Sequence, residues 1–130
     1  KHHGHIFDPD TPGTDTYRFN HGGAYGTVIT DDECYMLVKR ARTDENDLMG
    51  LFPEADLILL EGYKDSPWPK IEMRRDAAVS VCDKDSIIAV VADAEPNPDT
   101  ILPGTPVFAS SDFSGTAHFI AMAVGSRSGA

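Results

Sequence analysis

The sequence predicts an α/β fold with a mainly parallel sheet, and two apolar runs are the main observation behind this prediction. Residues 56–61 and 87–92 do not alternate between apolar and polar side chains, so a strand built from either run is buried on both faces. Each run is closed by an acid, Glu61 or Asp93, at the edge where open α/β sheets place their ligands. A third segment, residues 70–74, does alternate and predicts a half-exposed edge strand.

The first part of the chain predicts a helix and a hairpin. Thr14 or Asp15 can cap a short helix that runs to His21 and ends at two glycines. Residues 26–30 and 34–38 then read as two short strands around an acidic turn. We expect one domain over residues 1–130, because no repeat or low-complexity tract interrupts the chain.

Two further helices are expected, one before and one after the central sheet. Thr43 or Asp44 can cap a helix that carries Leu48, Met49 and Phe52. The short apolar run 106–109 precedes a last helix, for which Ser111 or Asp112 supplies the cap. Its expected apolar face consists of Phe113, Ala117, Ile120, Ala121 and Val124.

Charge and composition exclude several classes of partner. The net charge is −10 and the pI is near 4.7, which argues against nucleic acid or an anionic membrane as the main partner. A nucleotide is compatible with this charge, because backbone amides, one lysine and Mg²⁺ can hold its phosphates. Cys34 and Cys82 lie near apolar runs and are expected to be free thiols of a reducing compartment, the cytoplasm.

Glu61 is the first candidate for chemistry. A carboxylate at the end of a buried strand, followed by Gly62, is how nucleotide-hydrolysing folds hold Mg²⁺ or orient a water. The alternative is an acid that ends a strand and contacts no ligand.

A group of histidines near the start of the sequence is the second candidate. His2, His3 and His5, together with Asp8 and Asp10, offer the nitrogen and oxygen ligands that suit a transition metal. A hydrogen-bonded loop is the alternative interpretation, because the spacing matches no closed metal site.

Two blocks of residues carry a resemblance to a known family. They are Asp56-Leu57-Ile58-Leu59-Leu60-Glu61-Gly62-Tyr63-Lys64 with Pro69-Lys70-Ile71-Glu72, and Lys1-His2, His5, Asp8, Asp10, Pro12-Gly13, Asp15-Thr16-Tyr17 and Ala24. In order and spacing the chain resembles the molybdopterin-guanine-dinucleotide biosynthesis protein B (MobB) family, along most of its length and more loosely after about Ala94.

This sequence departs from the family pattern at several positions. Gly4 stands where the family usually has a histidine, while Thr14 and Thr16 replace a lysine and a serine. The glycine-rich phosphate loop with Gly-Lys-Thr or Gly-Lys-Ser occurs nowhere in these 130 residues. We therefore expect an incomplete domain, in which the first strand and the phosphate loop are absent.

The resemblance implies a P-loop NTPase-like layered fold with a mainly parallel sheet, plus a projecting edge strand or hairpin. It implies a GTP-binding accessory protein, at most a weak GTPase with Mg²⁺, that forms a homodimer and assists the molybdenum cofactor guanylyltransferase. Residues 70–74 are expected at a subunit contact. On matching positions, Asp15, Thr16, Glu61 and Gly62 are nucleotide-binding candidates, and Asp93 joins them from its strand-end position. Glu61 is also the expected Mg²⁺ ligand, and His2 and His5 are candidates for a second metal.

Two functions of other classes remain open at this point. The chain could be a histidine-rich metal carrier that has no use for nucleotide, or a structural module that only dimerises. A phosphate loop encoded upstream of Lys1 would favour the nucleotide protein over both.

Overall fold

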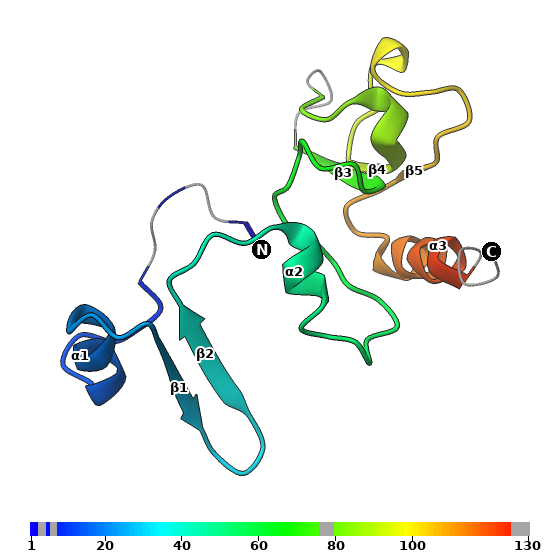
Figure 1. Cartoon of the computed structure of the whole chain (residues 1–130). Coiled ribbons are helices and arrows are strands. Elements are labelled where there is room, and N and C mark those ends of the chain that lie inside the picture. The colour runs from blue at the N-terminus through cyan, green and yellow to red at the C-terminus, as the bar shows by residue number, and fades with distance from the viewer. Residues whose placement is uncertain (3–4, 6–7, 76–79, 126–130) are drawn as a thin grey trace. The chain divides into compact units, whose positions relative to one another are not determined.

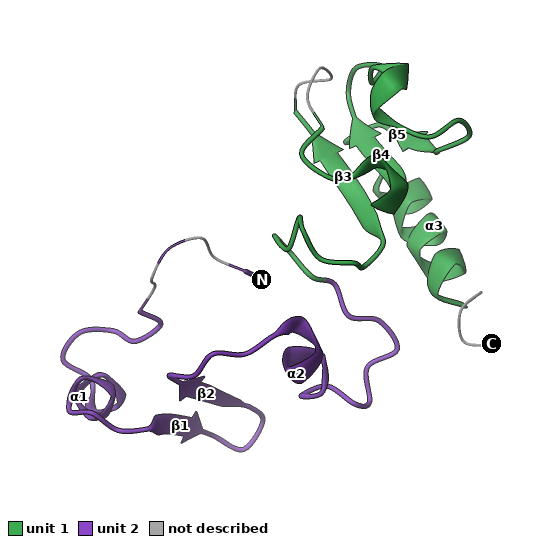
Figure 2. Ribbon diagram, turned by 45° about the horizontal axis from the view of Figure 1, so that its top comes forward, with its two compact units in different colours: residues 1, 60–130 green, residues 2–59 purple. Residues whose placement is uncertain are grey.

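The chain divides into two units, each described here by itself (Figure 2). A computed structural model describes residues 1–2, 5, 8–75 and 80–125. Unit 1 comprises Lys1 and residues 60–130, and unit 2 comprises residues 2–59. The expected single domain over residues 1–130 stays a prediction.

Unit 2 begins with the short helix α1, Asp15–His21. The Thr14 side chain accepts a hydrogen bond from the backbone N–H of Tyr17, and the N–H of Gly22 closes the last turn on the carbonyl of Arg18. These contacts satisfy backbone groups that a helix end otherwise leaves without partners. The predicted helix and its threonine cap are confirmed.

A hairpin follows, formed by β1 (Gly26–Thr30) and β2 (Tyr35–Lys39) in antiparallel register (Figure 1). The Asp31 carboxylate accepts the backbone N–H groups of Glu33 and Cys34, each at 2.8 Å. These two hydrogen bonds lower the pKa of Asp31 and fix the turn. The predicted hairpin is therefore confirmed, with its second strand beginning one residue later than expected.

The second helix, α2, spans only Glu45–Met49 and is capped by the side chain of Asp44. Phe52 lies beyond its end and is exposed. The predicted helix is confirmed, but it is shorter than its apolar residues indicated.

Unit 1 is built on a parallel sheet in the order β3-β4-β5. Its strands are β3 (Lys70–Arg74), β4 (Ile87–Ala92) and β5 (Val107–Phe108), and two short 3₁₀ helices, η1 (Lys84–Ser86) and η2 (Pro98–Thr100), lie in the connections. β4 is central and buried on both faces, with Val90 fully inaccessible. Cys82 and Ile101 pack against this core. The α/β class, the parallel sheet, the buried strand and the edge position of residues 70–74 are confirmed.

The strand expected at residues 56–61 is wrong. This stretch is irregular, and Leu57 and Leu59 are 43% and 70% exposed. A buried parallel strand needs hydrogen-bonding neighbours and apolar cover on both faces, and none of the described strands pairs with this stretch. Gly62 and Tyr63 follow it with φ values of 90° and 37°, so the backbone turns away at once from extended geometry.

The last helix, α3, spans Phe113–Gly125 and lies beside β5 (Figure 2). Asp112 accepts the N–H of Gly115 at 2.9 Å, and Phe119 packs on Phe108 with ring centroids 5.6 Å apart. The predicted cap is confirmed, but the predicted apolar face is wrong in part. Phe113 is 79% exposed, and the half-buried positions are Gly115, Thr116, Phe119, Ile120, Ala123 and Val124. The helix is thus rotated so that Phe119, outside the expected face, meets the sheet.

Within the described residues, none of the helices has both the length and the apolar character needed to cross a membrane.

Candidate functional site

The carboxyl edge of the parallel sheet is the place where this fold class binds ligands, and Asp93 lies there, directly after β4. Its Oδ1 accepts the backbone N–H of Ser110 at 3.0 Å, and its Oδ2 accepts the Ser110 hydroxyl at 2.8 Å. The hydroxyl and then the N–H lower the pKa of Asp93. Asp93 therefore stays charged and joins the end of β4 to the turn between β5 and α3.

Glu61 does not end a strand, which corrects the expected geometry of this residue. It lies in the exposed turn with Gly62, and Lys1 Nζ donates to its Oε1 at 2.7 Å. Both side chains are more than half exposed, at 62% for Lys1 and 69% for Glu61. The hydrogen bond from Lys1 lowers the pKa of Glu61. Glu61 is thus an exposed, ionised carboxylate, which is able to bind a cation. The sheet does not hold its side chain in a fixed orientation.

Asp15 and Thr16 belong to unit 2, at the first turn of α1. Asp15 Oδ1 accepts from Arg18 at 3.4 Å, and the hydroxyls of Thr14 and Thr16 lie 3.3 Å apart. The structure thus gathers two hydroxyls and one carboxylate at this turn. Their role toward a nucleotide stays a prediction, as it does for Glu61, Gly62 and Asp93.

The histidine group does not form a metal centre in the part of the chain that the structure describes. No cluster of three His, Cys, Asp or Glu side chains suited to a metal ion occurs there. Asp8 is paired with His21, Oδ2 to Nε2 at 3.2 Å, and Asp10 accepts a hydrogen bond from the buried Asn20. His3 lies outside the described residues, and metal binding by His2 and His5 stays a prediction.

Strand β3 carries a buried ion pair that was not predicted from the sequence. Glu72 and Arg74 are 4% and 6% exposed, whereas Met73 between them is 68% exposed. Arg74 Nε and Nη2 both reach Glu72 Oε2 at 2.6 Å. The polar face of this alternating strand is therefore the one that points inward. The subunit contact expected at residues 70–74 stays a prediction.

Glu72 holds the loop that precedes η1. Its Oε1 accepts the backbone N–H groups of Val81 at 2.7 Å and Cys82 at 3.2 Å, and the Ser80 hydroxyl lies 3.0 Å away. Burial alone raises the pKa of Glu72, but Val81 N–H, the Arg74 guanidinium and the Ser80 hydroxyl outweigh it and bring the pKa below its ordinary value.

Arg74 extends the same hydrogen-bond network to the short helix η2. Its Nη1 donates to the Thr100 hydroxyl at 2.8 Å and its Nη2 to the Thr100 carbonyl at 3.3 Å. Two charged side chains of one strand thus fix both the 80–82 loop and η2. The only signal in the sequence was the spacing: opposite charges two residues apart share a face of a strand.

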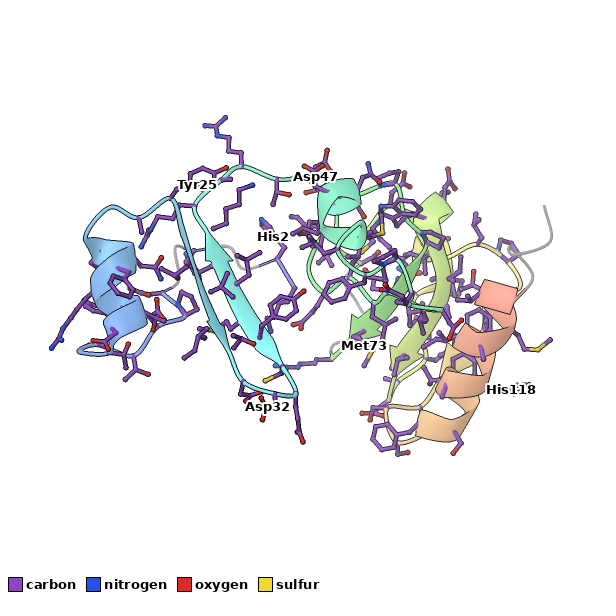
Figure 3. The ribbon with its side chains drawn as sticks, turned by 60° about the horizontal axis from the view of Figure 1, so that its bottom comes forward. His2, Tyr25, Asp32, Asp47, Met73 and His118 are labelled. Carbon is purple, nitrogen blue, oxygen red and sulfur yellow. The ribbon has the colours of Figure 1, made fainter. Side chains whose placement is uncertain are left out.

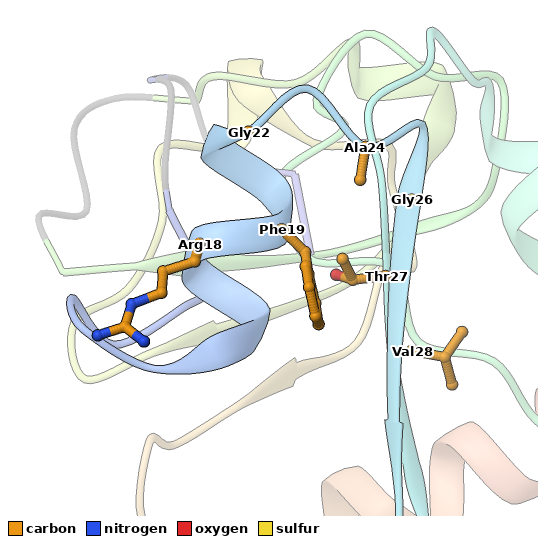
Figure 4. A pocket seen from close by; sticks show the side chains of 7 residues that line it. All are labelled: Arg18, Phe19, Gly22, Ala24, Gly26, Thr27 and Val28. Atoms are coloured by element: carbon orange, nitrogen blue, oxygen red, sulfur yellow. The ribbon is translucent and has the colours of Figure 1, made fainter.

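Unit 2 also has an open hollow between the end of α1 and the start of β1 (Figure 4). Gly22, Ala24 and Gly26 contribute backbone and small side chains, and Phe19 and Val28 contribute apolar surface. Arg18 stands at its rim, where it pairs with Asp15. The lining offers apolar contact and one partly engaged cation, and it contains no carboxylate, thiol or imidazole that could carry out chemistry.

A parallel sheet with an acid anchored at its carboxyl edge, followed by a helix, is typical of layered α/β proteins, the class that includes the P-loop NTPase-like fold. The likeness to a solved structure supports this class: the crystal structure of Bacillus subtilis MobB superposes with a TM-score of 0.61 and 26% identity, over 95% of this chain and 76% of that one.

The chain belongs to the MobB family, because the family model for molybdopterin guanine dinucleotide synthesis protein B matches residues 1–93. A relative from Escherichia coli (strain K12), a molybdopterin-guanine dinucleotide biosynthesis adapter protein, is 32% identical over 131 residues, which cover 92% of this chain and 71% of that protein. A relative from Bacillus subtilis (strain 168), a probable adapter protein of the same biosynthesis, is 39% identical over 75 residues, 55% of this chain. The match spans 43% of that second protein.

Proposed function

We propose that this chain is an accessory protein of molybdopterin guanine dinucleotide biosynthesis, and that it acts as an adapter for the guanylyltransferase that makes the dinucleotide. The observation that carries the proposal is the family match over residues 1–93, together with relatives named adapter proteins. None of the described clusters resembles a nucleophile with its general base, so binding and delivery fit this chain better than catalysis does.

The proposal includes a guanine nucleotide and Mg²⁺ as ligands of the protein when a phosphate loop is supplied. Glu61 supports the Mg²⁺ part, because it is an exposed carboxylate kept ionised by Lys1, and Mg²⁺ prefers one or two carboxylates plus water and phosphate oxygens. Gly62 lies beside it, and Asp93 supplies a second charged carboxylate at the sheet edge. In unit 2, Asp15 and the Thr16 hydroxyl are the candidates near the phosphates.

We propose the cytoplasm as the compartment of this protein, because the free thiols Cys34 and Cys82 suit a reducing environment, and we include a homodimer as its working form.

The adapter role is tested by guanylyl transfer in a reconstituted mixture. Adding the chain to the guanylyltransferase, molybdopterin and Mg-GTP should raise the rate of dinucleotide formation, and the two proteins should co-elute in gel filtration. An equal amount of heat-unfolded chain is the control for protein concentration. An unchanged rate together with separate elution would contradict the adapter proposal.

Nucleotide binding is tested by calorimetry with Mg-GTP. The 130-residue chain contains no phosphate loop, so we expect no micromolar binding by this chain alone, because that loop supplies most charge-assisted contacts to the phosphates. Fusing a strand, a Gly-Lys-Thr loop and a helix before Lys1 should create binding that Glu61→Gln weakens. Micromolar affinity of the unfused chain would show that other residues hold the phosphates.

A further inference from the structure

The hollow between α1 and β1 has an apolar wall that is largely in contact with water. Its volume is about 390 Å³, and Figure 4 shows the Phe19 ring beside the Thr27 side chain, on the opposite side of β1 from Val28. Thr27 is buried, whereas Phe19 is 62% exposed. An apolar side chain of another molecule that entered the hollow would remove much of the Phe19 ring from water, which is favourable.

Small residues keep this hollow open. Gly22 and Gly26 both line it, and Ala24 lies between them in the sequence. A Cβ at Gly22 would lie 3.0 Å from the Arg18 carbonyl oxygen, and a Cβ at Gly26 would lie 3.0 Å from the Val38 carbonyl oxygen. The backbone around the hollow is therefore too close to accept larger residues at these two positions without a shift.

A basic segment begins where the hollow ends. Gly26 pairs with Lys39 across the hairpin, so the last residue of β2 lies beside the lining of the hollow. Lys39, Arg40 and Arg42 are exposed, and none of the three forms an ion pair with a described carboxylate. We call the hollow together with residues 39–42 the basic corner.

The basic corner has the opposite charge to the chain as a whole. The chain has a net charge of −10, yet residues 16–30 and 35–43 contain no Asp or Glu, and every basic residue of unit 2 lies within them. Figure 3 shows Asp32 at the acidic tip of the hairpin and Tyr25 at the opposite end, where Lys39 Nζ lies 5.3 Å from the centroid of the Tyr25 ring. A negatively charged partner is thus attracted to this corner and repelled by the acidic remainder of the chain.

A short acidic protein segment fits the basic corner better than other anions do. The hollow lies at the C-terminal end of α1, which Gly22 caps, and the negative end of a helix dipole disfavours a phosphate there. A long polyanion such as nucleic acid would extend beyond the corner and meet the acidic surface. A short segment can place its carboxylates beside residues 39–42 and an apolar side chain in the hollow.

We propose that the basic corner docks a short acidic segment of a partner protein, and that one aromatic or aliphatic side chain of this segment enters the hollow against Phe19. The inference rests on the proposed function, under which the partner is the guanylyltransferase. The two parts of the corner have different effects on binding. Exposed cations raise the rate of encounter, whereas an apolar anchor in a pocket slows dissociation.

Two charge variants test the basic segment. Lys39→Glu and Arg40→Glu should each lower the association rate constant with the guanylyltransferase by about 3-fold to 10-fold at low salt, and the loss should shrink at high salt. Surface plasmon resonance measures association and dissociation separately. Lys84→Glu makes the same change of charge at an exposed position of unit 1. As the matched control, it should lower the association rate constant by less than about 2-fold.

Two other variants test the hollow, Phe19→Ser by removing its apolar wall and Ala24→Leu by filling it. Each should raise the dissociation rate constant by about 10-fold, with little dependence on salt, because the apolar anchor of the partner loses its contacts. Phe52→Ser removes a phenylalanine of similar exposure, 60%, elsewhere in unit 2 and should leave this rate constant unchanged. If Phe19→Ser lowers the thermal midpoint, Ala24→Leu gives the deciding result.

Each contrary outcome has its own meaning. A parent chain that does not bind the guanylyltransferase would overturn the adapter proposal and this inference with it. A parent that binds, with the same rate constants for all the variants, would leave the adapter role in place and overturn only the docking site. Two further results would also overturn it. Corner variants that change only self-association would assign the corner to a second copy of this chain, and a short single-stranded DNA that binds the parent but not Lys39→Glu would assign it to nucleic acid.

Discussion

Two runs of similar composition, residues 56–61 and 87–92, adopt different structures in this chain. The second is β4, the centre of the parallel sheet, with Ala89 and Val90 fully inaccessible. The first is an irregular and largely exposed segment, with Leu59 at 70%. Both lack alternation and both end next to an acid, so the local pattern is the same.

The difference lies in what flanks each run. β4 has β3 and β5 as hydrogen-bonding neighbours and packs against Ile101 and Cys82. Residues 56–61 have no such neighbour among the described strands. An apolar run thus offers burial, but the sheet must supply the partners, because unpaired backbone groups are too costly to bury. A non-alternating apolar run therefore indicates that a strand built from it would need burial on both faces. It does not show that the rest of the chain provides that burial.

The sharpest way to test the comparison is to place a charge in each run. Val90→Asp should lower the free energy of unfolding of unit 1 by more than about 4 kcal/mol, because it buries an unpaired carboxylate. Leu59→Asp, at the last residue of unit 2 and directly before unit 1 in the sequence, should change the same free energy by no more than about 0.5 kcal/mol. Urea unfolding followed by fluorescence of Trp68, the single tryptophan, measures both. A loss at Leu59 as large as that at Val90 would mean that the first run is buried in solution.

Two ion pairs of unit 1, one exposed and one buried, offer a second contrast. Arg74→Met removes one partner of a pair whose side chains are 1% and 3% exposed, and should cost about 3–5 kcal/mol, since Glu72 stays buried without its countercharge. Glu61→Gln breaks the exposed pair with Lys1 and should leave the urea midpoint unchanged. Equal midpoints for the two variants would refute the burial of the β3 pair.

Glu72 makes the stability of unit 1 depend on pH. Its folded pKa lies below the ordinary glutamate value of 4.5, so its contribution is fully present above that value. The contribution is lost as pH falls through the lower, folded pKa, because the protonated carboxyl no longer attracts Arg74 or the amides of residues 81 and 82.

Urea midpoints between pH 6 and pH 3 measure this dependence. The parent should lose stability steeply below pH 4.5, and Glu72→Gln should start lower and lose less over the same interval. Parallel curves for the two proteins would assign the pH dependence to other carboxylates.

The smallest effect is expected at Asp93. Asp93→Asn keeps one acceptor for Ser110 but removes the charge that both Ser110 donors face. The thermal midpoint should hardly move, since the residue is exposed, while the Ser110 amide should exchange faster with solvent. Val81, whose backbone N–H donates to Glu72 Oε1, serves as the control amide and should keep its exchange rate.

The sequence predicted much of this fold because many elements carry local signals. The Thr14 cap, the acidic hairpin turn and the Asp112 cap lie within a few residues of the groups that they bond. The inward face of β3 could not be predicted, because alternation shows which residues share a face and not which face receives cover. That cover comes from residues 80–82, which are irregular, and from Thr100 at the end of the three-residue helix η2. Neither segment is long enough to show a periodicity in the sequence. The exposed turn at Glu61 was not predicted either, because the apolar run before it gives no sign of the positive φ values of Gly62 and Tyr63.

The two thiols of the chain differ in a way that makes them reporters. Cys34 is exposed in the hairpin turn of unit 2, and Cys82 packs against the core of unit 1, where burial and then the charge of Glu72 raise the pKa of its thiol. A thiol reagent at neutral pH will therefore modify Cys34 first and reach Cys82 mainly when the loop held by Glu72 opens, because only the thiolate reacts. Mass spectrometry of the unmodified sequence gives both labelling rates. The Cys34 rate in unit 2 serves as the reference, and the Cys82 rate relative to it measures the local opening of unit 1. In a cell under oxidative stress, the same asymmetry would place the first lesion on the hairpin and spare the sheet.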